Sequence, residues 1–290
     1  MTKSRVFFAA ALLSAAAAPG LQTTAQAQGF DTIASSVTDT FQYAIDLLPR
    51  DVTAIRLGVG PVVLPEYMGD DRYKISPAPL ISLRYRDWFE IDNNELKITA
   101  RSKLVNTRTE VGGGRLRFGP LISLDFGRDE NDSNDLIGLG NVGTSLELGA
   151  FVGYAYGPVR GRIKAKYDVA GGHGGALIKG DVSLAVYRDE KLSVGSVASV
   201  TWASSDYMNS YFGITGAQSV GSGLAVYAPG SGFRDFSLGL GGNYAINDRF
   251  SVISNVGYSR LLKDAKNSPL VAQRGSPNQW QFSSYVVYSF

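Results

Sequence analysis

Apolar and polar residues alternate along most of this 290-residue chain, from about residue 51 to its C-terminal end. In the segment 159–169, for example, Ile163 and Tyr167 occupy odd-numbered positions, which are one parity of the alternation. Lys164 and Lys166 occupy even-numbered positions, the other parity. Because successive side chains of a β-strand point to opposite faces, a period of two predicts strands with one apolar and one polar face. The repeat excludes a mainly helical fold.

Twelve segments carry this alternation, and most have the length that crosses a bilayer as a tilted strand. We expect strands at residues 52–64, 75–86, 87–92, 95–105, 115–127, 143–156, 159–169, 176–188, 191–203, 235–246, 250–261 and 279–290. Aromatic residues near segment ends and a glycine-rich polar face distinguish the pattern from that of a soluble sandwich. The sequence therefore predicts an all-β fold, a transmembrane antiparallel β-barrel of twelve strands. Loss or fusion of the short segment 87–92 would give ten.

The connections between these segments fall into two classes. Tight turns at 157–158, 189–191 and 247–249 lie on one side of the predicted barrel. Long connections lie on the other side, at 65–74, 128–142, 204–234 and 262–278. Barrels of the bacterial outer membrane have short periplasmic turns and longer outer loops. The pattern therefore also predicts which end faces the cell surface.

The N-terminus has the features of a secretory signal peptide. Lys3 and Arg5 precede an apolar run that ends near Pro19, and Ala25-Gln26-Ala27 forms a small-residue cleavage site. The apolar run is too short for a membrane-spanning helix. We therefore expect residues 1–27 to be removed during export, and the mature protein to reside in the cell outer membrane.

Residues 28–50 form a short periplasmic leader before the predicted barrel of residues 51–290. Its apolar residues recur at helical spacing, namely Phe30, Ile33, Val37, Phe41, Ile45 and Leu48. The spacing favours an amphipathic helix, and a disordered leader is the alternative.

Composition excludes several classes of function. The chain has no Cys and a single His, which rules out a disulfide scaffold, a thiolate metal site and a His-cluster metal site. The formal charge is only +2, and Lys3 and Arg5 supply both units. A neutral mature chain argues against nucleic-acid binding. With no phosphate loop, nucleophile elbow or zinc signature, we expect no cofactor.

His173 is the strongest candidate for a catalytic residue. A nucleophile–base pair needs rigid placement of the base near its partner. His173 lies among four glycines, at 171–172 and 174–175, and this composition predicts a permissive, loosely held loop. We therefore expect a loop residue and a non-enzymatic protein.

Charged residues on the polar parity must face the lumen, since charges that face lipid are costly. The predicted lumen-facing charges are Lys97, Arg101, Lys103, Arg117, Glu147, Arg160, Arg162, Lys164, Lys166, Asp168, Lys179 and Asp181. One interpretation is a network of paired charges that fills the barrel. The other is a narrow pore with a mild preference for anions.

Two long outer connections carry distinctive residues. The segment 204–234 combines several Tyr and Phe residues with interspersed glycines, which fits either a contact surface or an inward-folding plug. The acidic run 129–135 lacks the Gly and Glu positions of an EF-hand loop. We expect that run to be a solvated loop on the lipopolysaccharide side.

The last segment ends on an aromatic residue. Trp280, Phe282, Tyr288 and Phe290 share one parity of the alternation. A terminal strand of this kind is similar to the signal that the barrel-assembly machinery recognises. It predicts assembly into outer-membrane lipid and lipopolysaccharide.

Several loop motifs carry a family resemblance. They include Pro65-Glu66-Tyr67-Met68-Gly69-Asp70, the pair Pro77 and Pro79, Tyr211-Phe212-Gly213-Ile214, and Asn267-Ser268-Pro269-Leu270-Val271. From about Ile55 to Phe290 the chain resembles the MipA/OmpV family, the MltA-interacting outer-membrane proteins.

This resemblance implies an outer-membrane barrel with one of two functions. In one branch, the barrel is a non-enzymatic scaffold whose periplasmic turns and leader bring a lytic transglycosylase, which is a murein hydrolase, together with a murein synthase. In the other branch it is a surface adhesin or stress-responsive protein. The motifs are shared by both branches.

Overall fold

The computed structural model describes residues 54–85, 88–99, 110–111 and 113–290. The predicted signal peptide, the leader and two predicted lumen charges, Arg101 and Lys103, lie outside the described residues.

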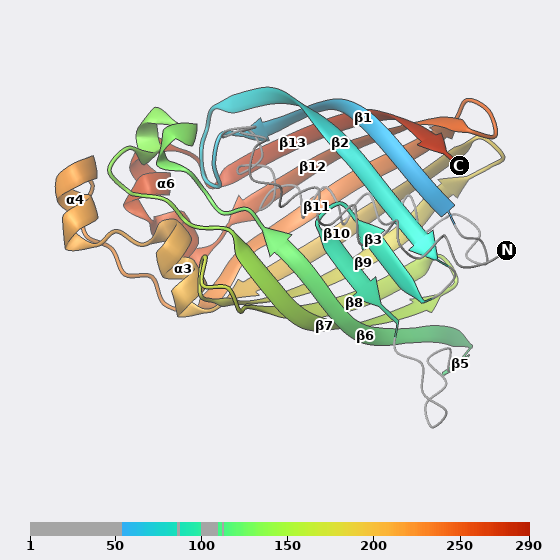
Figure 1. Ribbon diagram of the computed structural model, residues 1–290, viewed down its shortest axis with the longest axis horizontal. Coiled ribbons are helices and arrows are strands. Elements are labelled where there is room, and N and C mark those ends of the chain that lie inside the picture. The colour runs from blue at the N-terminus through green and yellow to red at the C-terminus, as the bar shows by residue number, and fades with distance from the viewer. Residues whose placement is uncertain (1–53, 86–87, 100–109, 112) are drawn as a thin grey trace, which may run out of the picture.

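The strands form one closed antiparallel sheet (Figure 1). The strands are β1 (Ala54–Pro65), β2 (Tyr73–Tyr85), β3 (Phe89–Asp92), β4 (Glu95–Ile98), β5 (Glu110–Val111), β6 (Gly114–Asp125), β7 (Ser145–Tyr156), β8 (Val159–Asp168), β9 (Ala176–Arg188), β10 (Leu192–Ala203), β11 (Gly232–Ala245), β12 (Phe250–Leu261) and β13 (Asn278–Ser289). β1 pairs with β13, and β4 pairs with β6, so the ring closes. The two-residue β5 pairs with β6 beyond the ring. The predicted twelve-strand barrel is confirmed.

The two faces of the wall have the predicted difference in polarity. Outward positions such as Ile163 and Val182 are 54% and 56% exposed, as lipid-facing side chains are when no lipid is present. Inward positions on the same strands include Lys164 and Asp181, which are buried. Because side chains alternate along a strand, one sequence period produces both an apolar outer band and a polar lumen.

Glycines let large side chains pack against the inner wall where β13 meets β1. A Cβ atom on Gly60 would lie 1.8 Å from the carbonyl oxygen of Ser284, and one on Gly58 would lie 2.9 Å from Val287 Cγ2. The two glycines therefore allow Tyr285 and Val287 to join a buried apolar cluster on the lumen side. The cluster comprises Val62, Leu64, Ala78, Leu80, Ile253, Tyr285 and Val287.

Among the described residues, the outer half of β2 has strand pairing on one side only. Ser82–Tyr85 pair with β3, and just above them the backbone of Asn93 donates to the carbonyl of Ile81 at 2.8 Å. Alternate residues direct their backbone polar groups to the same edge, so Pro77 and Pro79 face this edge beyond the hairpin. Proline has no N–H, so it leaves no donor unpaired there.

The two ends of the barrel differ, as the connection lengths predict. The four long connections predicted for the outer side gather at one end as a helical cap, while the tight turns at 157–158, 189–191 and 247–249 lie at the other end, where β5 also lies (Figure 1). The cap contains η1 (Glu130–Asp132), η2 (Asn134–Leu136), α3 (Ser205–Phe212), α4 (Gly216–Ser222), α5 (Lys263–Asn267) and α6 (Pro269–Arg274). Among the described residues, none of these helices has the length and the apolar character needed to cross a membrane.

The contact at Gly60 leads to a stability prediction. Gly60→Ala would place a methyl group against the backbone of β13, and we expect the free energy of unfolding to fall by about 1–3 kcal/mol. Gly180→Ala is the matched control, because no atom lies within 4 Å of a Cβ at that strand position. Urea unfolding of both variants in detergent micelles or bilayers checks this, and equal midpoints would contradict the packing described for β1 and β13.

Candidate functional site

Buried ion pairs inside the lumen connect strands that are not neighbours in the ring. Lys164 Nζ on β8 contacts the carboxylate of Glu95 on β4 at 3.0 Å, although β6 and β7 lie between these strands in the ring. Lys97 contacts the same carboxylate at 3.0 Å, and all three side chains are at least nine-tenths buried. Removing one partner of such a pair leaves an uncompensated buried charge and costs about 3–5 kcal/mol.

Further pairs extend this network toward the periplasmic end. Arg84 contacts Glu90 at 3.0 Å, and Arg117 approaches the same carboxylate at 3.5 Å. Lys97 lies 3.4 Å from Asp92. The sequence analysis did not select Arg84, Glu90, Asp92 or Glu95. Extending the parity rule could have found Arg84 on its strand and Glu95, which lies two residues before Lys97 on the same predicted strand.

The predicted lumen charges on β8 each face a different kind of residue on β9. Arg162 Nε donates to Asp181 at 2.9 Å. Arg160 lies opposite Ser183, and Lys164 lies opposite Lys179, in the register of the two strands. Like charges opposite one another are unfavourable, so the carboxylates that bind these cations are needed to hold this wall together.

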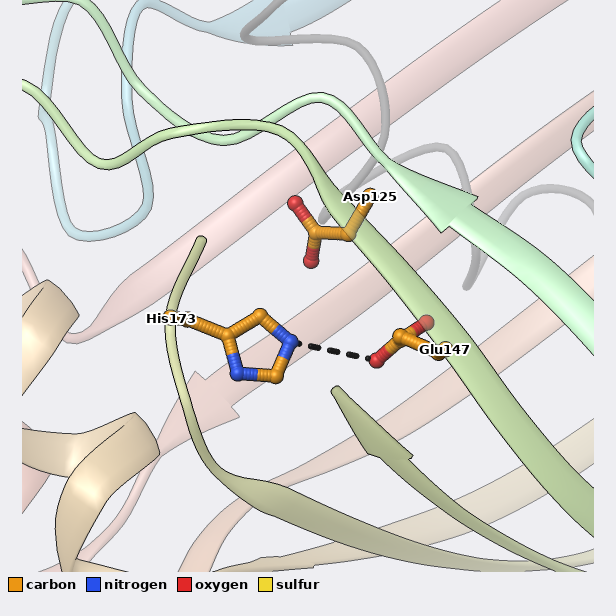
Figure 2. Close-up of side chains that lie close together, drawn as sticks. All are labelled: Asp125, Glu147 and His173. Carbon is orange, nitrogen blue, oxygen red and sulfur yellow. Dashed lines mark hydrogen bonds and ion pairs between the residues drawn. The ribbon is translucent and has the colours of Figure 1, made fainter. Parts of the chain in front are cut away.

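At the outer mouth, Glu147 is the hub of a buried cluster. It accepts hydrogen bonds from Lys166 Nζ and Ser123 Oγ at 2.5 Å each, and its other oxygen lies 3.3 Å from His173 Nε2. Figure 2 shows His173, Glu147 and Asp125 facing one another from two strands and a loop. Ligand atoms of these three residues lie within 4.8 Å of one another, which is compact enough for a metal ion.

The hydrogen bonds of His173 oppose the metal interpretation. The backbone N–H of Gly175 donates to His173 Nδ1 at 3.0 Å, so the neutral ring carries its proton on Nε2. That proton points at Glu147, which leaves no lone pair on Nε2 for a cation. In this arrangement, hydrogen bonds of His173 and Glu147 connect the barrel wall to the loop at 169–175. We call this connection the joint at His173.

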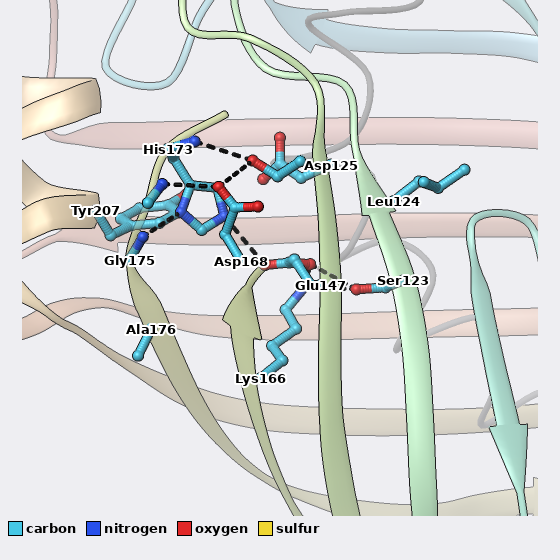
Figure 3. Close-up of polar contacts among 12 residues, drawn as sticks. Ser123, Leu124, Asp125, Glu147, Lys166, Asp168, His173, Gly175, Ala176 and Tyr207 are labelled. Atoms are coloured by element: carbon cyan, nitrogen blue, oxygen red, sulfur yellow. Dashed lines mark hydrogen bonds and ion pairs between the residues drawn. The ribbon is translucent and has the colours of Figure 1, made fainter. Parts of the chain in front are cut away.

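Helix α3 packs directly onto this joint. The ring of Tyr207 meets His173 edge-on with centroids 4.8 Å apart, and the hydroxyl of Tyr211 donates to Asp125 at 2.8 Å. Ser210 Oγ donates to the backbone carbonyl of His173 at 3.0 Å. Figure 3 shows Tyr207 beside His173, with Glu147 and Lys166 below them in the view. Helix α3 therefore packs inward over the lumen, and Tyr207, Tyr211 and Phe212 are buried as the inward-folding alternative expects.

The expectation of a loosely held loop around His173 was wrong. The side chain is 2% exposed, and the carboxylate of Asp168 accepts backbone N–H groups of the loop, including that of Gly174 at 2.7 Å. A Cβ atom on Gly175 would lie 2.4 Å from the backbone nitrogen of Tyr207. Glycine is needed there because helix α3 approaches closely.

A buried ion pair on β11, Arg234 with Asp235, also holds α3 in place through Tyr207. Arg234 Nη1 donates to the hydroxyl of Tyr207 at 2.6 Å, and Arg234 Nε donates to Asp235 at 2.5 Å. Burial raises the pKa of Tyr207 above its usual range, so the hydroxyl stays protonated at any physiological pH. The sequence analysis did not single out Arg234 or Asp235, because an Arg-Asp dipeptide at a strand start carries no distinctive pattern.

The acidic run 129–135 is organised, which differs from the expected solvated loop. Asp129 caps the 3-10 helix η1, and Asp135 pairs with Arg72. Ser133 Oγ donates to Asp70 at 3.3 Å, and burial raises the pKa of Asp70. The carboxylates therefore close the cap by binding backbone and arginine groups.

The family-like motifs meet within the cap, although they are far apart in sequence. A Cβ on Gly69 would lie 2.6 Å from Val271 Cγ2, and Ser268 Oγ donates to the carbonyl of Phe212 at 2.7 Å. Tyr67 is 2% exposed and packs in the cap. Gly213 ends α3, and Pro269 begins α6. These motifs therefore specify the closed outer end.

The C-terminal aromatic residues face outward on β13 and at its end. Trp280 and Phe282 are about half exposed, and their rings stack with centroids 6.3 Å apart. Tyr288 and Phe290 contact edge-on at 4.7 Å. Their role as an assembly signal stays a prediction.

The joint at His173 gives a second prediction. His173→Ala would leave the N–H of Gly175 and one oxygen of Glu147 without partners, and we expect local opening of the cap to become easier by about 1–3 kcal/mol. Proteolysis within 204–234, applied from the outer side of reconstituted vesicles, should accelerate by roughly 5- to 150-fold. Val220→Ala is the control, since Val220 is 88% exposed, and equal rates for both variants would show that His173 does not hold the cap.

The solved structures that align with this chain include two porins. The KdgM porin aligns with a TM-score of 0.41 and 10% identity, covering 82% of this chain and 99% of its own. The NanC porin aligns with a TM-score of 0.42 and 11% identity, covering 82% and 98%.

Sequence comparison gives the family. Outer membrane protein OmpV of Vibrio cholerae serotype O1 is 32% identical over 60% of this chain and 79% of its own length. Outer membrane protein Omp26La of Vibrio anguillarum is 30% identical over 58% and 77%. The family model described as MltA-interacting protein MipA matches residues 57–290. The chain is therefore an outer-membrane β-barrel protein that belongs to the MipA family.

Proposed function

We propose that this protein is a non-enzymatic scaffold that holds peptidoglycan-remodelling enzymes, a lytic transglycosylase and a murein synthase, at the outer membrane. The observation that carries the proposal is the way the barrel is filled. Buried ion pairs inside the lumen connect β8 to β4 past β6 and β7, and α3 packs over the outer mouth. Such an interior supports a rigid platform better than a narrow pore. The family description, MltA-interacting protein, supports a cell-wall hydrolase as a partner.

The periplasmic turns supply a docking surface of defined shape. Asp189 Oδ1 accepts the backbone N–H groups of Lys191 and Leu192 at 2.8 and 2.7 Å, which fixes one turn. Asn247 Oδ1 accepts the N–H groups of Arg249 and Phe250 in the same way, at 2.9 and 2.8 Å. Ordered turns lose little conformational entropy on binding. Their exposed charges of both signs suit a polar, reversible contact with a periplasmic enzyme.

Cross-linking in the native envelope tests this proposal. A photo-reactive residue in place of Glu190 should capture a murein hydrolase or synthase, because this side chain is exposed at the tip of an ordered turn. The same residue in place of Val220, on the outer cap, should capture neither. Capture of no murein enzyme from Glu190, with the barrel folded and present at normal levels, would overturn the scaffold.

The cap favours a second candidate, contact with another cell or surface. Ile137, Val220 and Val226 are apolar and 55%, 88% and 63% exposed. Gly138 and Gly221 lie against each other, so Ile137 and Val220 belong to adjoining segments. Exposed apolar groups outside the lipid band mark contact surfaces.

An adhesion assay tests this candidate. Val220→Asp should weaken binding of bacteria to host cells or abiotic surfaces at unchanged surface levels, because it places a charge in the exposed patch. Ala217→Asp, at an exposed position of the same helix, is the control. Equal adhesion of the Val220→Asp strain and the unmodified strain would remove this candidate.

A further inference from the structure

The lipid-facing side of the barrel wall carries a groove. It has a volume of about 470 Å³ and lies across β10–β13, from mid-height toward their outer ends. Leu238, Leu240 and Trp280 line it, and each of these side chains is about half exposed, so the groove opens toward lipid. The volume is typical of a ligand site, and the lining is almost entirely apolar. An apolar chain therefore fits this groove better than a polar ligand does.

The order of small and large side chains on the outer surface creates the groove. Ser196 and Val256 flank Leu240 in the register of the sheet, and these smaller side chains leave space beside it. One row nearer the outer end, the rings of Tyr258 and Trp280 lie side by side with centroids 5.1 Å apart. Such rings are typical of the membrane interface. The groove therefore begins at the level of the lipid headgroups and runs into the hydrocarbon layer.

A cation is held at the outer end of this groove. Arg260 has the same outward parity as Val256 and Tyr258, and it lies one residue before the end of β12. Arg260 Nη1 and the hydroxyl of Tyr258 both donate to Asn278 Oδ1, at 2.7 and 2.8 Å. The guanidinium is thereby fixed beside a side chain that lines the groove.

The positive charge of Arg260 is not compensated by the protein. Its partner Asn278 is neutral, and among the described residues no carboxylate forms an ion pair with Arg260. The other charged residues of the described strands face the lumen or lie at the periplasmic ends. A guanidinium binds a phosphate group through two parallel hydrogen bonds, and it needs no deprotonation to do so. A phosphate in the headgroup layer would supply the missing anion.

The spacing of the two features suits one amphipathic molecule. Arg260 is four residues from Val256, which corresponds to roughly 13 Å along the strand. A lipid whose phosphate lies on Arg260 would therefore extend its acyl chain past Tyr258 and along the groove. Free phosphate would use only the first feature, and an uncharged lipid would use only the second.

We propose that this groove is a specific site for one phosphorylated lipid of the outer leaflet, namely lipopolysaccharide. A phosphate group of the lipid binds Arg260, and one acyl chain lies against Leu240, Val256 and Trp280. The site holds this molecule more firmly than the lipids that merely surround the barrel, because a charge-assisted contact and a shaped apolar surface act together. It lies at the opposite end of the barrel from the turns proposed to dock murein enzymes, and it does not depend on them.

Binding of lipid A, the phosphorylated acyl anchor of lipopolysaccharide, tests this site. The mature chain in nanodiscs of zwitterionic phospholipid is titrated with lipid A, and native mass spectrometry measures the fraction of protein that retains one lipid A molecule. Arg260→Gln should weaken binding by about tenfold or more, because hydrogen bonds between charged groups are lost. Val256→Phe should also weaken it, because the ring fills the groove.

Removal of the phosphates from lipid A gives a complementary test. The dephosphorylated lipid should bind the intact chain about tenfold more weakly than lipid A does. It should bind the intact chain and Arg260→Gln with equal affinity, since the contact that distinguishes these two proteins is absent.

Matched variants control for charge and bulk alone. Lys263→Gln removes an exposed cation from the cap, and Val252→Phe adds a ring on β12 outside the groove, so both should bind lipid A as the intact chain does. Heat-dependent gel mobility shows whether each barrel is folded, and Leu240→Trp replaces Val256→Phe if the latter does not refold.

Two results would overturn the proposal. Equal affinity of the intact chain and Arg260→Gln for lipid A would show that no phosphate binds this residue. Equal affinity of the intact chain and the groove-filling variant would show that the acyl chain lies elsewhere on the barrel.

Discussion

Pairing of the backbone within the membrane is the constraint on which this structure depends. Water is absent from the hydrocarbon layer, so each N–H and C=O group must bind within the sheet. Closure through β1–β13 and β4–β6 meets this requirement, and among the described residues it leaves the outer half of β2 paired on one side only. Pro77 and Pro79 stand at that edge, where the missing N–H groups remove donors that would otherwise be unpaired.

Closure of the wall in turn requires the lumen to be filled. The inward parity of the strands carries charges, and a buried charge is tolerated only when it is paired. Lys164 and Glu95 pair between β8 and β4 inside the lumen, and Lys166 and Glu147 pair at its outer end. Glu147 then connects the wall to the cap through His173 and Tyr207. The outer end is consequently part of the same network that holds the strands together.

The sequence predicted the barrel well because period two is a local property. Eleven of the twelve strands that form the ring, all except the short β4, match their predicted segments closely, and the four connections predicted to be long and outer lie at one end as expected. The candidate site was predicted less completely. Parity placed Glu147, Lys166 and Asp181 on the lumen side, but Asp125, Glu95 and Arg234 were not selected. His173 was judged from its glycine neighbours, and those glycines admit helix α3 and hold tight turns.

The sequence by itself determined the fold class, the outer-membrane location and the parity of each strand, because these follow from hydrophobicity at successive positions and from motifs along the chain. Only the tertiary structure decided which charges are partners, that helix α3 packs over the lumen, and that His173 is a buried joint. Those features depend on contacts between strands and loops far apart in the chain, such as β4 with β8 and α3 with the loop at 169–175. Such distances are set by the closure and tilt of the sheet, which no local pattern of residues encodes.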